Sequence, residues 1–448
     1  MIRPCCRGWG SLYRTQTLVI GDDPTGCNLT GAIFTKKDFS ALTAWDVESA
    51  KKISADFDVI LFDTNTRHLS PLNAYQQVSE ILKDFGVLGH LAKRIDSTLR
   101  GNLGPEVQAI LDRLRGGDIS NSVQGLVVSA FPDAMRTTRN GEQYVNGSLL
   151  TSSPVSADPL NPIVESDVGS LMTANTSLTA SYIFLDVVRD SVEVLSKHIL
   201  SQETDLIIFD SETNEDIARI VSALNHLGSV NRLWVTVDPG PFTVAYLNSV
   251  LRSRLGKTKR HALRESVFLF AFIGSSTELT RQQIEFSKKH SSIAWLSVNT
   301  QSDSIGSILE QISILAESGV TNIGLVVDYS EGSGAGDHYS EYHQFDIALA
   351  TIASEIIEQI EPRGIYTSGG DTTLAILKAL GAQGLQVTDE VFSGAVAGIL
   401  VGGKSDGMSI VTKGGLMGSE DGISQAFTYL NEVSNVQVTT MGKESRRS

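Results

Sequence analysis

Short apolar runs alternate with helix-like stretches along almost the whole chain, and this alternation constrains the fold more than any other feature. The predicted strands are TLVIG, DVILFDT, GLVVSAF, SYIFLDV, DLIIFD, LWVTVD, VFLFAFIG, IAWLSV, NIGLVVDYS, GIYTSG and MSIVTKG. Near-continuous apolar runs of this kind suit strands that are covered on both faces, because a strand with one solvated face alternates apolar and polar residues. Stretches between them, such as 72–85 and 304–317, have helical spacing. The pattern predicts an α/β fold with mostly parallel sheets flanked by helices.

The composition changes sharply at RSRLGKTKRHALRES, residues 252–266, which is basic and poor in large apolar residues. This segment lies between the two groups of predicted strands, and 448 residues suit two or three domains at about 150 residues each. We therefore predict one domain at 15–251, a linker at 252–266 and a second domain at 267–435. Residues 1–14 and 436–448 are expected to be disordered tails, although the arginines near the start also weakly resemble a transit peptide.

Charge and cysteine content exclude several classes of protein. The net charge of -15 argues against a nucleic-acid or anionic-membrane partner. Two of the three cysteines lie within the first six residues, so there is neither a disulfide framework nor a zinc pattern. A reducing compartment, the cytoplasm, is expected. No apolar run is long enough to predict a membrane-spanning helix.

Two adjacent carboxylates, Asp22 and Asp23, follow the first predicted strand, and Gly26 lies in the turn after them. In open parallel sheets, ligands bind beyond the carboxyl ends of the strands. Carboxylates there can orient a polyol or accept a proton from an attacking hydroxyl. Alternation along an extended backbone should point the two side chains in opposite directions, so they should not share one role. The competing interpretation is that Asp22 caps the next helix and Asp23 is solvated.

A second polar stretch, AKRIDSTLRGNLGPEV, spans residues 92–107 and contains Arg94, Asp96, Ser97 and Arg100. Two arginines in one loop are a candidate clamp for a carboxylate or phosphate, because a guanidinium binds such groups through two parallel hydrogen bonds. The competing interpretation is a surface ion pair with Asp96.

Two further strand ends carry polar residues: Arg67 follows one, and Arg136 and Thr137 follow another. Together, four strand ends deliver Asp, Arg or Thr, as one pocket for a small hydroxylated acid requires. The alternative is four solvated loops.

The second half has three loops rich in Gly, Ser and Thr, each of which follows a predicted strand and precedes a helix. Their candidate residues are Ser275 and Ser276, then Gly369, Gly370, Asp371 and Thr372, then Lys413 and Gly415. Backbone N–H groups at such helix starts bind phosphates, which suggests a nucleotide. Thr280 and Gln283 have the spacing of a capping box. The alternative is three ordinary turns. LRSRLGKT is not a Walker motif, because Leu251 occupies the position of the first glycine.

At these residues the chain resembles the four-carbon acid sugar kinases, a family that includes 3-oxo-tetronate, threonate and erythronate kinases. The resemblance spans about 17–430 and rests on an ordered series: DDPTGCNLTGA, RIDSTLRGN, FPDAMRTTRNGEQYVNG, SGGDTT and VTKGGLMG. It implies an N-terminal acid-sugar domain, a C-terminal ATP domain and an active site in the cleft between them. It also implies transfer of a phosphoryl group to a terminal hydroxyl of a small sugar acid.

Position by position, the resemblance makes two sets of residues functional. The acid-sugar residues would be Asp22, Asp23, Arg94, Asp96 and Arg100. The ATP residues would be Ser275, Ser276, Gly369, Gly370, Asp371 and Gly415. Asp23 is then the expected general base, Asp22 orients the sugar, and Arg94 or Arg100 holds the carboxylate end. ATP with Mg²⁺ would supply the phosphoryl group. The sequence assigns no metal ligands.

Two other interpretations are weighed against a kinase. A non-catalytic sugar-acid or nucleotide sensor on the same fold would be expected to lose the carboxylates or the arginines, and this chain has both. A dinucleotide-dependent oxidoreductase would need G-x-G-x-x-G, which is absent. The expected partners are therefore a sugar acid and ATP, with a homodimer possible.

Overall fold

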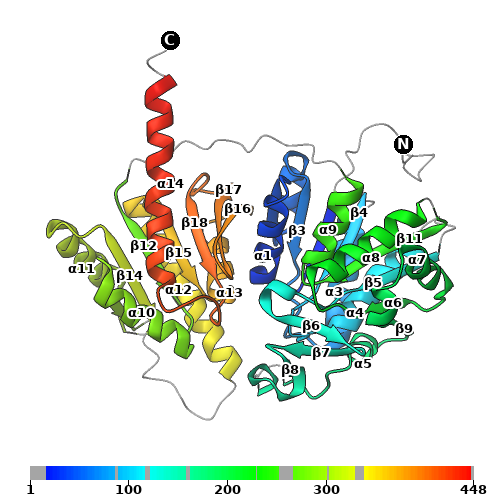
Figure 1. Ribbon diagram of the computed structural model, residues 1–448. Coiled ribbons are helices and arrows are strands. Elements are labelled where there is room, and N and C mark those ends of the chain that lie inside the picture. The colour runs from blue at the N-terminus through cyan, green and yellow to red at the C-terminus, as the bar shows by residue number, and fades with distance from the viewer. Residues whose placement is uncertain are drawn as a thin grey trace. The chain divides into compact units, whose positions relative to one another are not determined.

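The computed structural model describes residues 17–85, 89–116, 122–157, 162–228, 230–251, 266–299, 302–327 and 338–444. The chain separates into two compact units, Met1–Gly256 and Lys257–Ser448. The expected N-terminal tail and nearly all of the expected linker lie outside the described residues. Figure 1 shows both units as sheets flanked by helices, which confirms the predicted α/β class with two domains.

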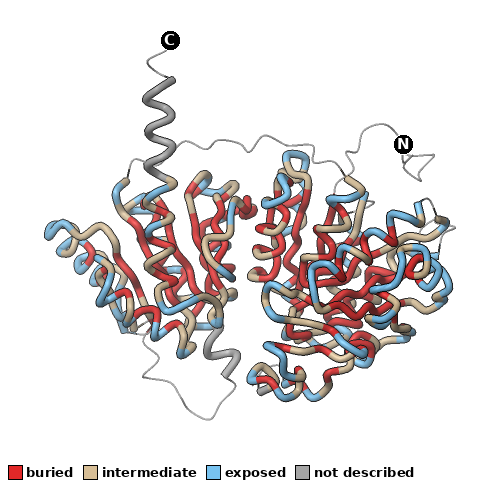
Figure 2. Tube along the Cα trace, in the orientation of Figure 1, coloured by how far each residue is buried: buried red, intermediate tan, exposed pale blue. Residues whose placement is uncertain are grey.

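The sheet of the first unit has the strand order β2-β3-β1-β4-β11-β5-β10-β9, and every pair is parallel. These strands are β1 (Thr17–Gly21), β2 (Ala41–Ala44), β3 (Val59–Asp63), β4 (His90–Arg94), β5 (Ser122–Val127), β9 (Ala180–Ile183), β10 (Leu206–Phe209) and β11 (Arg232–Asp238). Every residue of β1 and β3 is buried, so both faces of these strands are covered, as their apolar sequences predict. Figure 2 shows this burial along the central strands.

The helices of this unit pack on the sheet in two series, and within each series neighbouring helices contact one another. One series is α1 (Pro24–Thr35), α9 (Pro241–Val250), α8 (Asn214–Leu227), α7 (Val192–Ser201) and α6 (Leu185–Val188). The other is α2 (Val47–Ile53), α3 (Pro71–Phe85), α4 (Leu103–Arg115) and α5 (Val168–Thr173). Apolar residues of α7, α8 and α9 pack on β5 and β10 in one continuous core, which includes Leu126, Ile207 and Phe242. The helices thus hold the strand ends in fixed positions.

A second, antiparallel sheet of three short strands was not predicted. It consists of β6 (Arg136–Arg139), β7 (Glu142–Val145) and β8 (Ser148–Leu149). Asn140–Gly141 and Asn146–Gly147 form its two turns, and all four residues have positive φ. This is the pattern of two-residue type I′ turns, which Asn-Gly favours because both positions need left-handed backbone.

The sheet of the second unit has the order β13-β14-β12-β15-β18-β17-β16. Its strands are β12 (Leu269–Ile273), β13 (Ala294–Val298), β14 (Asn322–Val327), β15 (Gly364–Ser368), β16 (Gly384–Phe392), β17 (Ala395–Val401) and β18 (Ser409–Lys413). The first five strands in this order are parallel, and β17 and β16 add an antiparallel edge. The sequence did not predict that edge.

The helices of the second unit are α10 (Glu278–His290), α11 (Ile305–Glu317), α12 (His338–Ile360), α13 (Gly370–Ala379) and α14 (Gly422–Glu444). Helix α14 therefore continues into the segment 436–448 that was expected to be a disordered tail, and its first turns pack against β15 and β18. Among the described residues, none of the helices combines the length and apolarity that crossing a bilayer requires.

Candidate active site

Acidic and basic side chains meet at the carboxyl ends of three neighbouring strands of the first unit. Because β1 lies between β3 and β4, the residues that follow or end these strands share one edge of the sheet. Arg67 Nε donates to Asp22 Oδ2 at 2.7 Å, and its Nη2 is 2.9 Å from Asp23 Oδ1. Arg94 Nη1 is 3.3 Å from Asp22 Oδ1 and 2.5 Å from Asp23 Oδ1. The two carboxylates thus share two arginines, and the expectation that they point apart is wrong.

Asp23 also begins helix α1. Its Oδ1 accepts a hydrogen bond from the backbone N–H of Gly26 at 3.1 Å, which makes it the N-cap. The helix cap is therefore Asp23, and the alternative that Asp22 caps the helix is wrong. Burial alone would raise the pKa of Asp22, but Arg67, Lys93 and Arg94 outweigh it and lower that pKa to about 2. Asp22 is consequently a carboxylate at neutral pH.

Gly26 is necessary because Arg94 lies against the first turn of α1. A Cβ at this position would be 1.7 Å from Cζ of Arg94, well inside van der Waals contact. The guanidinium therefore fills the space that a side chain at residue 26 would need. Gly101, with φ of +93°, also lies close to the cluster, since a Cβ there would be 3.1 Å from Asp22 Oδ2.

The loop after β4 adds a second carboxylate–arginine group. Asp96 Oδ2 accepts hydrogen bonds from Arg100 Nε at 2.7 Å and from Thr98 Oγ1 at 2.5 Å. Arg67 Nη2 lies 3.9 Å from Asp96 Oδ1 and so links the two groups. Although burial opposes it, the nearby arginines, with Arg100 the strongest, hold the pKa of Asp96 well below its usual range.

The remaining predicted residues of this unit, Ser97, Thr137 and Arg136, have different surroundings. Ser97 contributes its backbone carbonyl, which accepts from Gln143 Nε2 at 3.2 Å. Thr137 is half-buried in β6, where its backbone pairs with Tyr144. Arg136, half-buried at the start of β6, donates from Nη1 to the carbonyl of Ala134. Arg136 is near enough for Asp96 and Arg100 to influence its pKa.

A buried ion pair that was not predicted lies close enough to the cluster for its lysine to lower the pKa of Asp22. Lys93 Nζ is 2.5 Å from Glu106 Oε2 and also donates to the carbonyl of Arg94 at 2.8 Å. The other oxygen, Glu106 Oε1, accepts from Thr66 Oγ1 at 2.6 Å. The Lys93 and Glu106 side chains are 0% and 1% exposed. They tie β4 and α4 to the loop that carries Arg67.

In the second unit, the three predicted loops follow β12, β15 and β18, which are neighbouring parallel strands. Thr277 Oγ1 donates to the carbonyl of Gly415 at 2.8 Å, and Ser275 Oγ is 2.9 Å from Thr280 Oγ1. A Cβ at Gly415 would be 2.5 Å from Ser275 Oγ, so the first and third loops are in contact. Helix α10 is capped by Thr277, whose side chain accepts from the N–H of Thr280. The capping box predicted at Thr280 and Gln283 is therefore wrong, because the helix begins one turn earlier, after Thr277.

The middle loop, Gly369–Thr372, is held by a residue that the sequence analysis missed. Thr372 Oγ1 donates to Asp346 Oδ1 of α12 at 2.5 Å, and a Cβ at Gly274 would be 2.1 Å from the same hydroxyl. Asp346 is 9% exposed. Burial, with a smaller contribution from Asp371, raises its pKa to about 7 even though the Thr372 hydrogen bond opposes the shift.

Lys413 ends β18 and is 1% exposed. Its Nζ donates to the carbonyls of Gly414 at 3.1 Å and Gly415 at 3.4 Å, and burial lowers its pKa to about 8. Gly370 and Asp371 begin helix α13 directly after β15, and Lys413 ends the adjacent strand β18, so that the helix start and this cation share one edge of the sheet. Backbone N–H groups with a nearby lysine suit phosphate oxygens. In the part of the chain described, no group of three or more His, Cys, Asp or Glu side chains could hold a metal ion.

Comparison with known proteins gives two domain families. Residues 17–246 match the model of a sugar-binding N-terminal domain, and residues 270–423 match that of a nucleotide-binding C-terminal domain. The Asp–Arg cluster lies in the first match and the Gly/Ser/Thr loops in the second.

Relatives of known activity cover nearly the whole chain. A D-erythronate kinase of Heliobacterium modesticaldum is 32% identical over 94% of this chain and 98% of its own. A D-threonate kinase of Salmonella typhimurium is 27% identical over 93% and 99%, and a 3-oxo-tetronate kinase of Pseudomonas fluorescens is 22% identical over 92% and 96%. The fold also matches a solved structure described as a putative tRNA synthase from Salmonella typhimurium LT2. That match has 18% identity and a TM-score of 0.71, and it covers 92% of this chain and 99% of that one.

Proposed function

Because the chain belongs to the four-carbon acid sugar kinase family, we propose that it transfers a phosphoryl group from ATP to a terminal hydroxyl of a four-carbon sugar acid. Its relatives act on D-erythronate, D-threonate and 3-oxo-tetronate, and a tetronate or 3-oxo-tetronate is the substrate proposed here. The observation that carries this proposal is the cluster of Asp22, Asp23, Arg67 and Arg94, which lies within the sugar-binding domain.

Asp23 is proposed as the general base and Asp22 as the group that orients the sugar hydroxyls. The Asp23 side chain is 19% exposed, against 3% for Asp22 and 8% for Asp96, so it is the carboxylate of this cluster that a substrate hydroxyl can best approach. Asp22 remains ionised and holds two arginines in place. Phosphoryl transfer depends mainly on positioning and charge neutralisation, so a base of modest strength is sufficient.

ATP is proposed to bind at Ser275, Ser276, the Gly369–Thr372 loop, Lys413 and Gly415. The start of α13 would direct backbone N–H groups at the phosphates, and Lys413 would add a positive charge. Mg²⁺ prefers oxygen ligands, and the carboxylates of Asp371 and Asp346, which lie near enough for Asp371 to raise the pKa of Asp346, are proposed to hold it. When bound with the nucleotide, Mg²⁺ neutralises the negative charge of the phosphates.

The test is ADP release measured over a panel of tetronates and 3-oxo-tetronates, with ATP and Mg²⁺ present and folding verified by circular dichroism. ADP should form only when a sugar acid is added. Binding of both ligands without any ADP would favour the sensor, and no ADP and no binding would end the kinase proposal. Cytoplasmic location, a homodimer and an active site between the domains stay predictions.

Calorimetry on two variants tests the division of the ligands between the domains. Asp371→Ala should weaken ATP binding and leave sugar-acid binding nearly intact. Arg100→Ala should do the reverse, with a loss of about 1.5–3 kcal/mol of charge-assisted hydrogen bonding. The opposite pattern would reverse the assignment of the two sites.

A further inference from the structure

The cluster in the first unit contains one more arginine than carboxylates. Its carboxylates are Asp22, Asp23 and Asp96, and its arginines are Arg67, Arg94, Arg100 and Arg136. Three of the arginines have carboxylate partners: Arg67 and Arg94 at Asp22 and Asp23, and Arg100 at Asp96. Arg136 forms no ion pair with any of the residues that the structure describes. Arg136 is therefore the arginine of this cluster that has no carboxylate partner among the described residues.

Hydrogen bonding and electrostatics also distinguish Arg136 from the other arginines of the cluster. Its Nη1 donates to the Ala134 carbonyl, whereas its Nε is buried without a hydrogen-bond partner. Arg94 Nε shares this last feature, but Arg94 Nη1 already contacts both Asp22 and Asp23. For Arg94, carboxylates outweigh burial and raise the pKa, whereas burial lowers the pKa of Arg136 despite Asp96, and Arg100 lowers it further. A partly desolvated cation of this kind gains most from a new anion.

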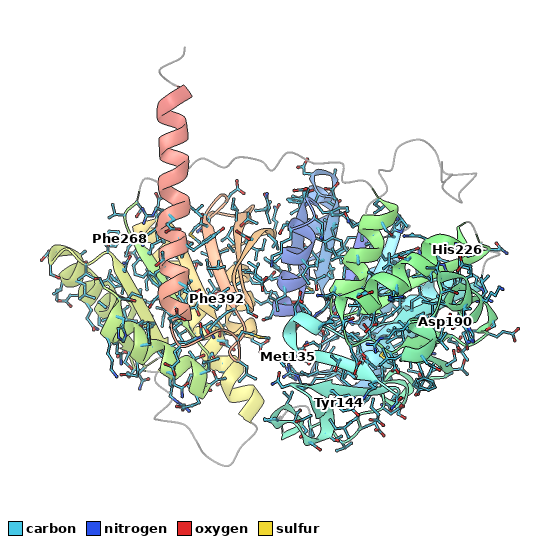
Figure 3. All side chains as sticks on the ribbon, in the orientation of Figure 1. Met135, Tyr144, Asp190, His226, Phe268 and Phe392 are labelled. Atoms are coloured by element: carbon cyan, nitrogen blue, oxygen red, sulfur yellow. The ribbon has the colours of Figure 1, made fainter. Side chains whose placement is uncertain are left out.

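The backbone holds Arg136 in a fixed place. Met135, labelled in Figure 3, has a left-handed φ of 57° and leads directly into β6. Arg136 then exchanges two backbone hydrogen bonds with Phe131, at 2.8 and 3.0 Å, and pairs with Val145 of β7. The backbone of Arg136 is therefore held in place, and the residue as a whole is half-buried.

We propose that Arg136 binds the carboxylate of the sugar acid and so selects acids over neutral polyols of the same length. This inference rests on the proposed function. Arg94 and Arg100, to which the sequence pointed for this role, are already paired with carboxylates of the chain. Arg136 has no carboxylate to pair with in the described part of the chain, and a guanidinium can hold a substrate carboxylate through two parallel hydrogen bonds. Asp22 and Asp23 then remain for the hydroxyls.

The experiment compares Arg136→Gln and Arg136→Lys with Arg139→Gln as a matched control. Arg139 lies on the same strand, but its side chain is 52% exposed and 3.8 Å from Glu212. Each protein is assayed with the tetronate that the wild type uses best, and the dissociation constant of the corresponding neutral amide is measured by calorimetry.

Arg136→Gln should lower kcat/KM for the acid about 10–150-fold, mainly through KM, as expected for one charge-assisted contact. Affinity for the amide should change less than about threefold. Arg136→Lys keeps the charge without the fork and should lose less, whereas Arg139→Gln should match the wild type.

Each outcome supports or refutes the proposal. Equal losses for acid and amide would show that Arg136 supports the site without reading the carboxylate, and an unchanged KM for the acid would overturn the proposal outright. If Arg136→Gln does not fold, the same comparison is made with Arg136→Lys. A loss of kcat/KM for the acid that exceeds the loss of affinity for the amide would then support the proposal, and equal losses would refute it. A wild-type protein without turnover on any sugar acid would instead refute the proposed function.

Discussion

Replacing Lys93 by methionine should destabilise the first unit in a way that depends on pH. Methionine keeps most of the volume of the side chain and removes its charge, so Glu106 is left buried without its partner. Thr66 can still donate to Glu106, but one neutral hydrogen bond does not replace an ammonium ion. Breaking a buried pair by removing one member typically costs about 3–5 kcal/mol.

The pH dependence follows from Glu106. Burial already raises its pKa although Lys93 opposes the shift, and loss of Lys93 must raise it further. A group whose folded pKa lies above its unfolded value of about 4.5 binds a proton more tightly in the folded state. The folded variant is therefore least impaired at low pH, where Glu106 is protonated, and loses stability as pH rises toward the folded pKa. We expect the first unit of the variant to be less stable than that of the wild type by ~1 kcal/mol at pH 5 and by about 3–5 kcal/mol at pH 8.

Hydrogen exchange in urea, read by mass spectrometry on peptides from β4 and α4, isolates this unit from the other one. The double variant Lys93→Met/Glu106→Gln should recover most of the loss and show little pH dependence, because no uncompensated charge remains. Lys52→Met, which breaks the exposed pair with Glu48, is the control and should change little. A deficit in Lys93→Met that is equal at pH 5 and pH 8 would refute the reasoning, since Glu106 would then not be its source.

Three further predictions concern single residues. Asp23→Asn should reduce kcat about 10²–10⁴-fold with little change in sugar-acid affinity, as for loss of a general base, and near-normal single-turnover rates would place the base elsewhere. Gly26→Ala should displace the Arg94 guanidinium and destabilise the first unit by about 1–3 kcal/mol. It should also weaken sugar-acid binding while ATP binding stays normal, and an unchanged sugar-acid affinity by calorimetry would contradict the contact. Asp346 has a folded pKa of about 7, above its unfolded value, so the wild type loses stability as the pH rises from about 4 to 7. Asp346→Asn should remove this loss and raise Tm relative to the wild type at pH 8 but not at pH 4, whereas an equal shift at both would argue against a buried carboxylate.

Most strands of the two parallel sheets could be predicted because their runs are largely apolar, whereas β2 (Ala41–Ala44) and β4 (His90–Arg94) were not predicted. In β1 and β12, every residue is buried, and each run stands between stretches with helical spacing. The β6–β8 sheet was missed for the opposite reason, since its strands are short and polar. The two Asn-Gly pairs at 140–141 and 146–147 carried the signal, because both positions of a type I′ turn require positive φ. A search for turns as well as apolar runs would have found it.

The candidate site divides in the same way. Asp22, Asp23 and Arg67 follow strands that could be predicted, and parallel strands bring such residues to one edge. Glu106 and Asp346 lie within helices, where a single carboxylate looks like any solvated residue until its distant partner is known. Arg94 was expected in a loop, but it ends strand β4, because the mixed sequence His90–Arg94 lacks the apolar character of the other strands.

The contact between Gly26 and Arg94 has a consequence for how sequences of this family can diverge. The guanidinium occupies the volume that any side chain at residue 26 would enter, so residue 26 can become larger only if residue 94 also changes. Among homologues, the two positions should vary together: where glycine is replaced, the residue at the end of β4 should be small or differently directed. Such paired substitutions would mark branches in which the sugar pocket has been rebuilt around another anchor.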